Sequence, residues 1–306
     1  MKKLTLHLLL FLFPIFLGIL IIPISPKQLS SGLKNDCHNR ASWMYSRLYE
    51  NSKPIDLAFI GSSRTMNSVN DRELQQELPQ LSTVNFAYCR YGRNLQLRLL
   101  KNLVEKKHLQ YLVLEVRVDE NPFSHPIFPY LATNKDLIQS QPLFNKDYIS
   151  DWSKSWQYRL QLSKEKLWGN KIEDKHSTNT FGFTPQEYSI SINELDSIRQ
   201  KRLATQRPSG FKRDMDDYYP EQYLKRISKY CKSHNIKLYF LYLPALGRNS
   251  PAPNNAEKYR EMGSLLLPPS SIFTNLNNWT DGNHLNRNGS EEVSDWLLSV
   301  FAKELN

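Results

Sequence analysis

Three residues that lie far apart in the sequence have side chains that could together do nucleophilic chemistry. Ser63 follows a glycine that ends a short apolar run, in the stretch "DLAFIGSSRTMN". Asp281 and His284 are separated by two residues in "NWTDGNHLNRNG", just before the last amphipathic segment. A serine nucleophile needs a base to take its proton, and the base needs a carboxylate on its other ring nitrogen. These residues therefore indicate a triad with Ser63 as nucleophile, His284 as base and Asp281 as orienting carboxylate.

Each half of this triad also has an ordinary structural interpretation. Gly-Ser-Ser after a strand is common turn chemistry, in which a serine caps the next helix. Asp281 and His284 could instead lie in a surface loop and face water. The two halves together favour catalysis, because a serine at the start of a helix lies near backbone N–H groups that can stabilise an oxyanion.

Short apolar runs alternate with amphipathic segments along the chain. Four apolar runs are typical of strands buried in a parallel sheet, at 55–60, 84–88, 111–118 and 236–244. Three segments have apolar residues at helical spacing, at 95–107, 221–235 and 291–305. The alternation predicts an α/β fold of three α/β/α layers with a mainly parallel sheet.

The first 25 residues differ from the rest of the chain. Lys2 and Lys3 precede an apolar stretch from Leu4 to Ile24, and a bilayer core requires about 20 apolar residues. No small-residue cleavage site follows, so residues 1–25 are expected to be an uncleaved signal-anchor helix with a cytoplasmic N-terminus. A cleaved signal peptide is the alternative. The remaining chain would then lie outside the cytoplasmic membrane, in the periplasm or at the cell surface.

The extracytoplasmic part divides into a linker and one domain. Residues 26–54 are expected to form the linker and a short helix, and 55–306 the domain. Within it, 122–218 is rich in aromatic and polar residues and is too long for a simple loop. We expect this insertion to lie over the carboxyl ends of the strands, where open α/β sheets bind ligands.

Charge and cysteine content narrow the possible functions. The chain has 40 Lys+Arg against 30 Asp+Glu, a net charge of +10. No zinc-finger spacing or aromatic RNA-binding motif accompanies this charge, so a basic surface facing anionic lipid or polymer is favoured over nucleic acid. The 3 cysteines include no C-x-x-C pair, which argues against a structural zinc site. At most one pair of them can form a disulfide, and the triad chemistry requires no metal or other cofactor.

Three stretches carry a resemblance to a known family. "FIGSSRT" resembles the first block of the SGNH (GDSL-like) hydrolase superfamily, with Ser63 in the nucleophile's place and Ser62 where Asp is usual. "DGNHLNRNG" resembles the last block, in which Asp281 and His284 would complete the triad. "VNFAYCRYG" is similar to the second block, whose glycine maps to Gly92. The resemblance implies an SGNH/flavodoxin-like fold and an oxyanion hole made by the N–H groups of Ser63 and Gly92.

The third block of the family, Gly-x-Asn-Asp, is absent. After the third apolar run the chain reads "LEVRVDENPF", and Asn121 is the nearest candidate for the missing oxyanion donor. Arg117 could supply a positive donor instead, or could form a salt bridge with Glu115 or Glu120. Arg64 and Arg117 are also candidate substrate-binding residues.

The anchor, the Ser-Ser variant of the first block and the outward-facing domain are also similar to two acyl-transferring branches. These are the D-alanyl-lipoteichoic acid transfer proteins and the alginate O-acetylation proteins. The similarity implies an O-acyltransferase or esterase acting on a cell-envelope or exported polysaccharide. It also implies an acyl carrier or acylated polysaccharide as substrate, and a multi-spanning membrane acyl exporter as partner. The alternative is a non-catalytic envelope-binding or scaffold protein that keeps the fold.

Overall fold

The structure, a computed structural model of the chain, describes most of its residues. These are 24–33, 36–140, 145–168, 179–205, 210–248 and 250–305, with Lys3, His7, Leu10, Phe11 and Phe13. The expected signal-anchor, residues 1–25, thus lies almost wholly outside the described residues. Among the residues that are described, no helix is long and apolar enough to cross a membrane.

The apolar runs form a parallel sheet. Its strands within the described ranges are β1 Leu57–Ile60, β2 Thr83–Asn85, β3 Tyr111–Val116, β4 Lys237–Tyr242 and β5 Ser264–Leu266. They are ordered β2-β1-β3-β4-β5, and every neighbouring pair is parallel. The sheet confirms the predicted α/β class. The class was predictable because strands that are buried on both faces form continuous apolar runs, with no alternation of polar residues.

Strand β5 was not predicted from the sequence. It has 3 residues, which are exposed or half-buried, and it pairs with β4 at the edge of the sheet. A short edge strand carries no continuous apolar run, so it lacks the signal that marked the other strands. Gly263 leads into β5 where a Cβ would lie 2.4 Å from the carbonyl oxygen of Leu238. The close approach of the two backbones therefore requires glycine there.

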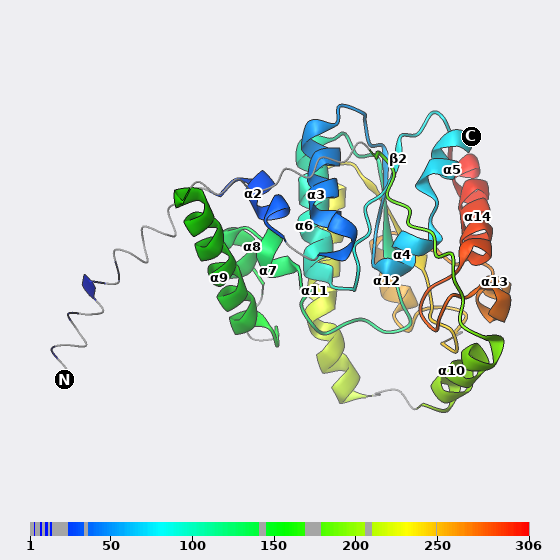
Figure 1. The fold of residues 1–306 in the computed structure, drawn as a ribbon. Helices are drawn as coiled ribbons and strands as arrows, with labels where there is room; N and C mark the ends of the chain where they lie inside the picture. Colours follow the sequence, from blue (N-terminus) through cyan, green and yellow to red (C-terminus); the bar gives the residue numbers. More distant parts are fainter. Residues whose placement is uncertain are drawn as a thin grey trace.

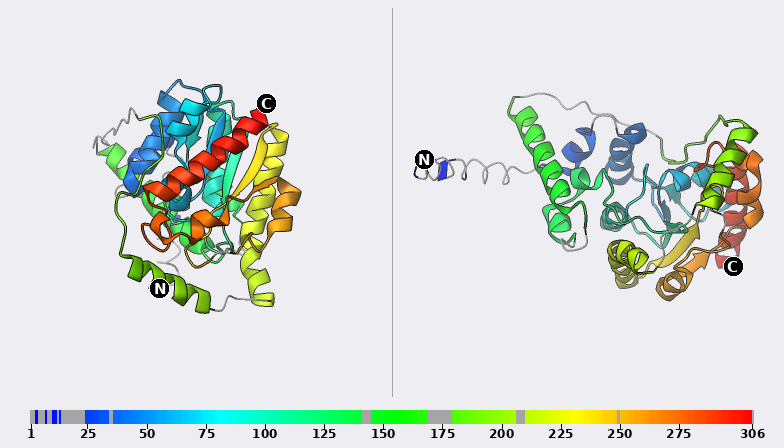
Figure 2. Two further views of the ribbon diagram at one scale, coloured as in Figure 1. Left: turned by 90° about the vertical axis from the view of Figure 1, so that its right-hand side faces the viewer. Right: turned by 90° about the horizontal axis from the view of Figure 1, so that it is seen from below.

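Helices cover both faces of the sheet (Figure 1). Those of the described chain are α2 Pro26–Ser31, α3 Arg40–Tyr45, α4 Ser63–Ser68, α5 Asp71–Glu77, α6 Arg93–Lys106, α7 Phe128–Leu131, α8 Asn134–Ile138, α9 Tyr148–Leu167, α10 Ile192–Ala204, α11 Phe211–Ser233, α12 Ala256–Met262, α13 Ser270–Thr274 and α14 Arg287–Leu305. Alternate residues of β1 enter two separate apolar clusters, Ala58 and Ile60 on one face and Leu57 and Phe59 on the other. Helices α3, α6 and α11 pack on the first face, and α5, α13 and α14 on the second. Figure 2 shows α14 lying across the strands.

The segment 26–54, which was expected to form a linker and a short helix, packs into the core. Trp43, Met44 and Leu48 are buried in the same cluster as α6 and α11. The guanidinium of Arg40 donates to the carbonyl oxygens of Asn85, Ala87 and Gly182 at 2.7–2.8 Å. This part of the chain therefore holds the end of β2 to a segment that lies about a hundred residues downstream.

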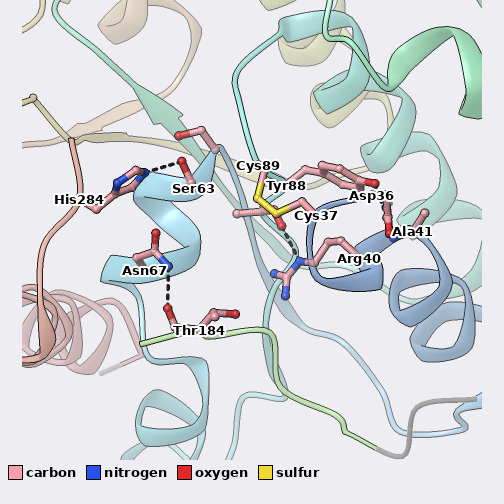
Figure 3. Close-up of a disulfide and its surroundings, with 12 residues drawn as sticks. Asp36, Cys37, Arg40, Ala41, Ser63, Asn67, Tyr88, Cys89, Thr184 and His284 are labelled. Atoms are coloured by element: carbon pink, nitrogen blue, oxygen red, sulfur yellow. Dashed lines mark hydrogen bonds between the residues drawn. A yellow bond between two sulfur atoms is a disulfide. The ribbon is translucent and has the colours of Figure 1, made fainter. Parts of the chain in front are cut away.

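A disulfide joins the same two regions. Cys37 is bonded to Cys89, with their Cα atoms 6.0 Å apart, while Cys231 is free and buried. Figure 3 shows the bridge together with Tyr88, whose hydroxyl donates to Asp36 at 2.6 Å. The pairing that the sequence left open thus ties the segment before α3 to the loop between β2 and α6.

Reduction of this disulfide should destabilise the fold. In the loop-closure description, opening a bridge with a sequence separation of 52 lowers the free energy of unfolding by about 4 kcal/mol. Urea unfolding with and without a reductant measures the difference. The double variant Cys37→Ser, Cys89→Ser is the matched control and should not respond to the reductant. A reductant-insensitive wild type would contradict the bridge.

Candidate active site

Gly61 and Ser62 place Ser63 at the first residue of helix α4. A Cβ on Gly61 would lie 2.1 Å from Oγ1 of Thr65 and 2.6 Å from Oε2 of Glu115, so no side chain fits. Ser62 caps the helix, because its Oγ accepts from the N–H of Arg64 at 3.1 Å. Glycine at the end of β1 therefore lets the chain turn tightly against the buried carboxylate of Glu115.

The three predicted catalytic side chains meet in the structure. Nε2 of His284 lies 2.8 Å from Oγ of Ser63 (Figure 3). Nδ1 of the same ring lies 2.9 Å from Oδ2 of Asp281. Burial raises the pKa of Asp281, but hydrogen bonds from His284 and from the N–H of Asn283 outweigh it and hold the pKa below its usual value. The carboxylate is thus ionised and holds the tautomer whose Nε2 can accept the serine proton.

A tight loop before α14 presents Asp281 and His284. The N–H groups of Asn283 and His284 donate to Oδ1 of Asp281 at 2.6 and 3.0 Å. The N–H of Thr280 donates to the carbonyl oxygen of His284 at 2.9 Å, and Trp279 bridges to Leu285. The Asp carboxylate therefore shapes the loop that carries its own histidine partner.

Behind the nucleophile, Glu115 of β3 is fully buried and binds the turn from below. It accepts the N–H of Ser62 at 2.6 Å, the hydroxyl of Ser62 at 2.8 Å and the hydroxyl of Thr65 at 2.7 Å. Arg117 donates its Nε–H to Glu115 at 2.7 Å and an Nη2–H to Ser62 at 2.5 Å. Burial raises the pKa of Glu115, but Arg117, Arg64 and the Ser62 N–H reverse the shift and lower the pKa to about 2.

Two backbone N–H groups near the nucleophile are unpaired. Neither Ser63 nor Gly92 donates its N–H to any other described residue. The N–H of Tyr88 donates to the carbonyl oxygen of Gly61 at 3.1 Å. The loop that leads from Tyr88 to Gly92 therefore begins beside the turn at Gly61 and Ser62. A Cβ on Gly92 would lie 2.6 Å from Cβ of His125, so the packing requires glycine. These are the two donors that the sequence assigned to an oxyanion hole.

The weaker site predictions have other partners. The side-chain amide of Asn121 donates to the carbonyl oxygen of Tyr91 at 2.6 Å and to that of Phe123 at 3.4 Å, so it supports the Gly92 loop and offers no free donor. Arg117 forms the ion pair with Glu115 that the sequence left open, while Glu120 pairs with Arg93. The guanidinium carbon of Arg117 also lies 4.1 Å from the ring centroid of Tyr91. Arg64 donates to the carbonyl oxygen of Leu243 at 2.9 Å.

Helix α10, from the predicted insertion, contacts the His284 loop. Nη1 of Arg202 donates to the carbonyl oxygen of Gly282, and Nη2 donates to Oδ1 of Asn283 at 3.1 Å. The N–H of Ile190 donates to the carbonyl oxygen of Thr280 at 2.9 Å. Arg202 was not assigned to the site from the sequence. It belongs to a run of basic residues, and such a run is typical of a helix face exposed to solvent.

Glu115 was also missed as a residue of the site. Its signal was present, since it is the one charged residue within the apolar run "YLVLEV" of strand β3. A charge inside a strand buried on both faces needs partners, because burying an unpaired charge is costly. The turn at Ser62 and the guanidinium of Arg117 are those partners.

One group of possible metal ligands occurs among the described residues. The ligand atoms of Cys37, His38 and Cys89 lie within 4.8 Å of one another. The two sulfurs are joined in the disulfide, so neither offers a thiolate to a metal in this state.

The sequence matches no protein-family model, and no curated protein matches it at a significant level.

The Glu115 network should make stability depend on acid pH. A carboxylate whose pKa falls from 4.5 to about 2 on folding stabilises the folded chain above pH 4.5. That contribution is lost as the pH falls from 4.5 towards 2. Wild type should thus be more stable than Glu115→Gln near neutral pH, and the difference should shrink in this acidic range. Urea unfolding midpoints from pH 7 to pH 2 measure it, and a difference that does not change with pH would contradict the assignment.

Proposed function

We propose that this chain is an SGNH-like serine acyl-transfer enzyme, an O-acyltransferase or esterase. The observation that carries the proposal is the hydrogen-bonded series from Ser63 through His284 to Asp281, assembled from residues 221 positions apart. The unpaired N–H groups of Ser63 and Gly92 support it as oxyanion donors. The parallel sheet and the position of Ser63 after β1 agree with the family resemblance.

In the proposed reaction Oγ of Ser63 attacks the carbonyl carbon of an ester. Nε2 of His284 accepts the hydroxyl proton, and Asp281 stabilises the resulting imidazolium. The negative charge that develops on the carbonyl oxygen is bound by the N–H groups of Ser63 and Gly92. Collapse of the intermediate breaks the bond to the leaving oxygen, which takes the proton from His284 and departs as the alcohol, and an acyl-serine remains. Water or a sugar hydroxyl then attacks the acyl-serine by the same steps in reverse.

The proposed setting is the cell envelope. The apolar residues 1–25 would anchor the chain in the cytoplasmic membrane, and the catalytic domain would lie outside it. The disulfide between Cys37 and Cys89 supports an oxidising compartment. We further propose that the substrate is an acylated polysaccharide or acyl carrier, with a multi-spanning membrane acyl exporter as partner. Helix α10, lying against the His284 loop, would cover the site and limit the access of water.

A non-catalytic envelope-binding protein is the second candidate. The observation in its favour is that the side-chain amide of Asn121 is bonded to Tyr91, so Asn121 does not replace the missing Gly-x-Asn-Asp donor. Loss of one oxyanion donor lowers turnover by about 10²–10³-fold in other serine enzymes, which weakens catalysis without removing the nucleophile. Covalent labelling therefore separates the two candidates.

A fluorophosphonate probe should label the wild-type chain at Ser63. Ser63→Ala should abolish labelling and ester turnover, and His284→Ala should lower turnover nearly as far because the hydroxyl loses its base. Asp281→Asn should cost roughly 10⁴-fold in turnover, as for a wrongly set imidazole tautomer in other triads. The losses should not add in double variants, since the three residues act as a unit. Fluorescence of the labelled band and release of the alcohol measure these effects.

Two serine controls accompany this experiment. Ser299→Ala removes an exposed hydroxyl on α14 and should label as wild type does. Ser62→Ala should still be labelled at Ser63, because Oγ of Ser62 bonds Glu115 and Arg117 and not an imidazole. Folded Ser63→Ala protein that labels as well as wild type would exclude catalysis by this triad.

A further inference from the structure

Four arginines line one pocket beside the triad. The pocket has a volume of about 290 Å³, and its lining includes Arg64, Arg117, Arg202 and Arg248. Asn283 also lines it, next in sequence to His284, and Arg64 follows Ser63 directly. Two residues of the pocket lining are therefore direct sequence neighbours of the proposed nucleophile and of its base.

Three of these guanidinium groups are held in place by the protein. Arg64 is bonded to the carbonyl oxygen of Leu243, and Arg117 to Glu115 and Ser62. Arg202 is bonded to the carbonyl oxygens of Gly282 and Leu246 and to the side chain of Asn283. Most of these partners are neutral oxygens, which orient a guanidinium without cancelling its charge.

The fourth arginine has no such partner. The side chain of Arg248 forms no hydrogen bond or ion pair with any described residue. It follows Gly247, whose φ of +73° lies in the left-handed region and whose position leaves no space for a Cβ against Arg199. The chain thus makes a glycine-dependent turn that ends with a cation at the pocket.

Carboxylates balance only part of this charge. Glu115 neutralises Arg117, and Asp119 at the pocket wall keeps its negative charge although it accepts from the neutral amide of Asn254 at 2.5 Å. Asp281 is engaged with His284, so the four arginines outnumber the carboxylates that face them. The pKa of Arg64 falls to about 9, mainly because the side chain is buried. Repulsion from Arg117 and Arg202 lowers this pKa further, while attraction to Glu115 opposes the shift. Like charges held together in a partly buried space favour the binding of an anion.

We propose that this pocket binds an acidic group, a carboxylate or a phosphate, of the saccharide whose ester reacts at Ser63. Guanidinium groups match both anions because their N–H donors form paired hydrogen bonds to two oxygens. The volume of about 290 Å³ lies at the lower end of ligand pockets, which suits one acidic sugar unit. This inference rests on the proposed function, since it names the charge of that enzyme's substrate.

The first test measures binding without turnover, on the full chain in detergent. Calorimetric titrations with galacturonate, inorganic phosphate and neutral methyl galactoside compare the carboxylate, the phosphate and an uncharged sugar. At least one anion should bind about tenfold more tightly than the neutral sugar, a factor typical of one charge-assisted hydrogen bond. Arg248→Ala should remove that preference. The matched control Arg260→Ala removes an exposed positive charge on α12 that pairs with Glu257, and it should keep the preference.

The second test measures ester cleavage. Acetyl esters of methyl galacturonide, methyl galactoside 6-phosphate and methyl galactoside are compared by kcat/KM for acetate release, and an acidic ester should react fastest. Arg248→Ala should lower the ratio of acidic to neutral kcat/KM by about tenfold. Equal binding and equal cleavage of acidic and neutral sugars would overturn the inference. Selective anion binding by a chain that never reacts with a fluorophosphonate would support the pocket and refute the acyl-transfer function.

Discussion

The buried carboxylate of Glu115 determines where Ser63, the proposed nucleophile, can lie. It binds the N–H and hydroxyl of Ser62 and the hydroxyl of Thr65 from a position within strand β3, and Arg117 supplies the opposing charge. Where the resembling family usually has an Asp before the nucleophile, this chain has Ser62, and a carboxylate approaches the same residue from the neighbouring strand. Removing either partner would leave a buried charge or buried donors unsatisfied, so the turn, the start of α4 and the end of β3 depend on one another.

That arrangement couples the candidate triad to the charge around the pocket. The ion pair between Glu115 and Arg117 holds one guanidinium at the pocket wall, and the turn it stabilises places Arg64 beside Ser63. From the opposite side, α10 contributes Arg202, which also binds the loop of His284. The same contacts that position the proposed nucleophile and base therefore position the cations that would select an acidic substrate.

The loop that carries Gly92, the proposed oxyanion donor, is held by contacts that reach the N-terminal segment. The loop carrying Gly92 is bonded to Asn121 through Tyr91 and is joined to Cys37 through Cys89. Arg40 adds hydrogen bonds to the end of β2 and to Gly182. The segment 26–54 is thus part of the structure that supports Gly92, although its sequence, with polar residues between short apolar groups, is typical of a linker.

The sequence by itself determined the class of the fold and the three residues of the triad. Strands buried on both faces and amphipathic helices leave a local periodic signal, and a Ser, an Asp and a His in such contexts are recognisable by type. Only the tertiary structure decided the pairing of Cys37 with Cys89, the position of Glu115 under Ser62, and the meeting of Arg64, Arg117, Arg202 and Arg248. The physical reason is that the strand order β2-β1-β3-β4-β5 and the insertion bring residues that are distant in sequence together at the carboxyl ends of the strands. Contacts between residues so far apart in the chain leave no trace in local spacing, and the edge strand β5 was missed because its three partly exposed residues form no apolar run.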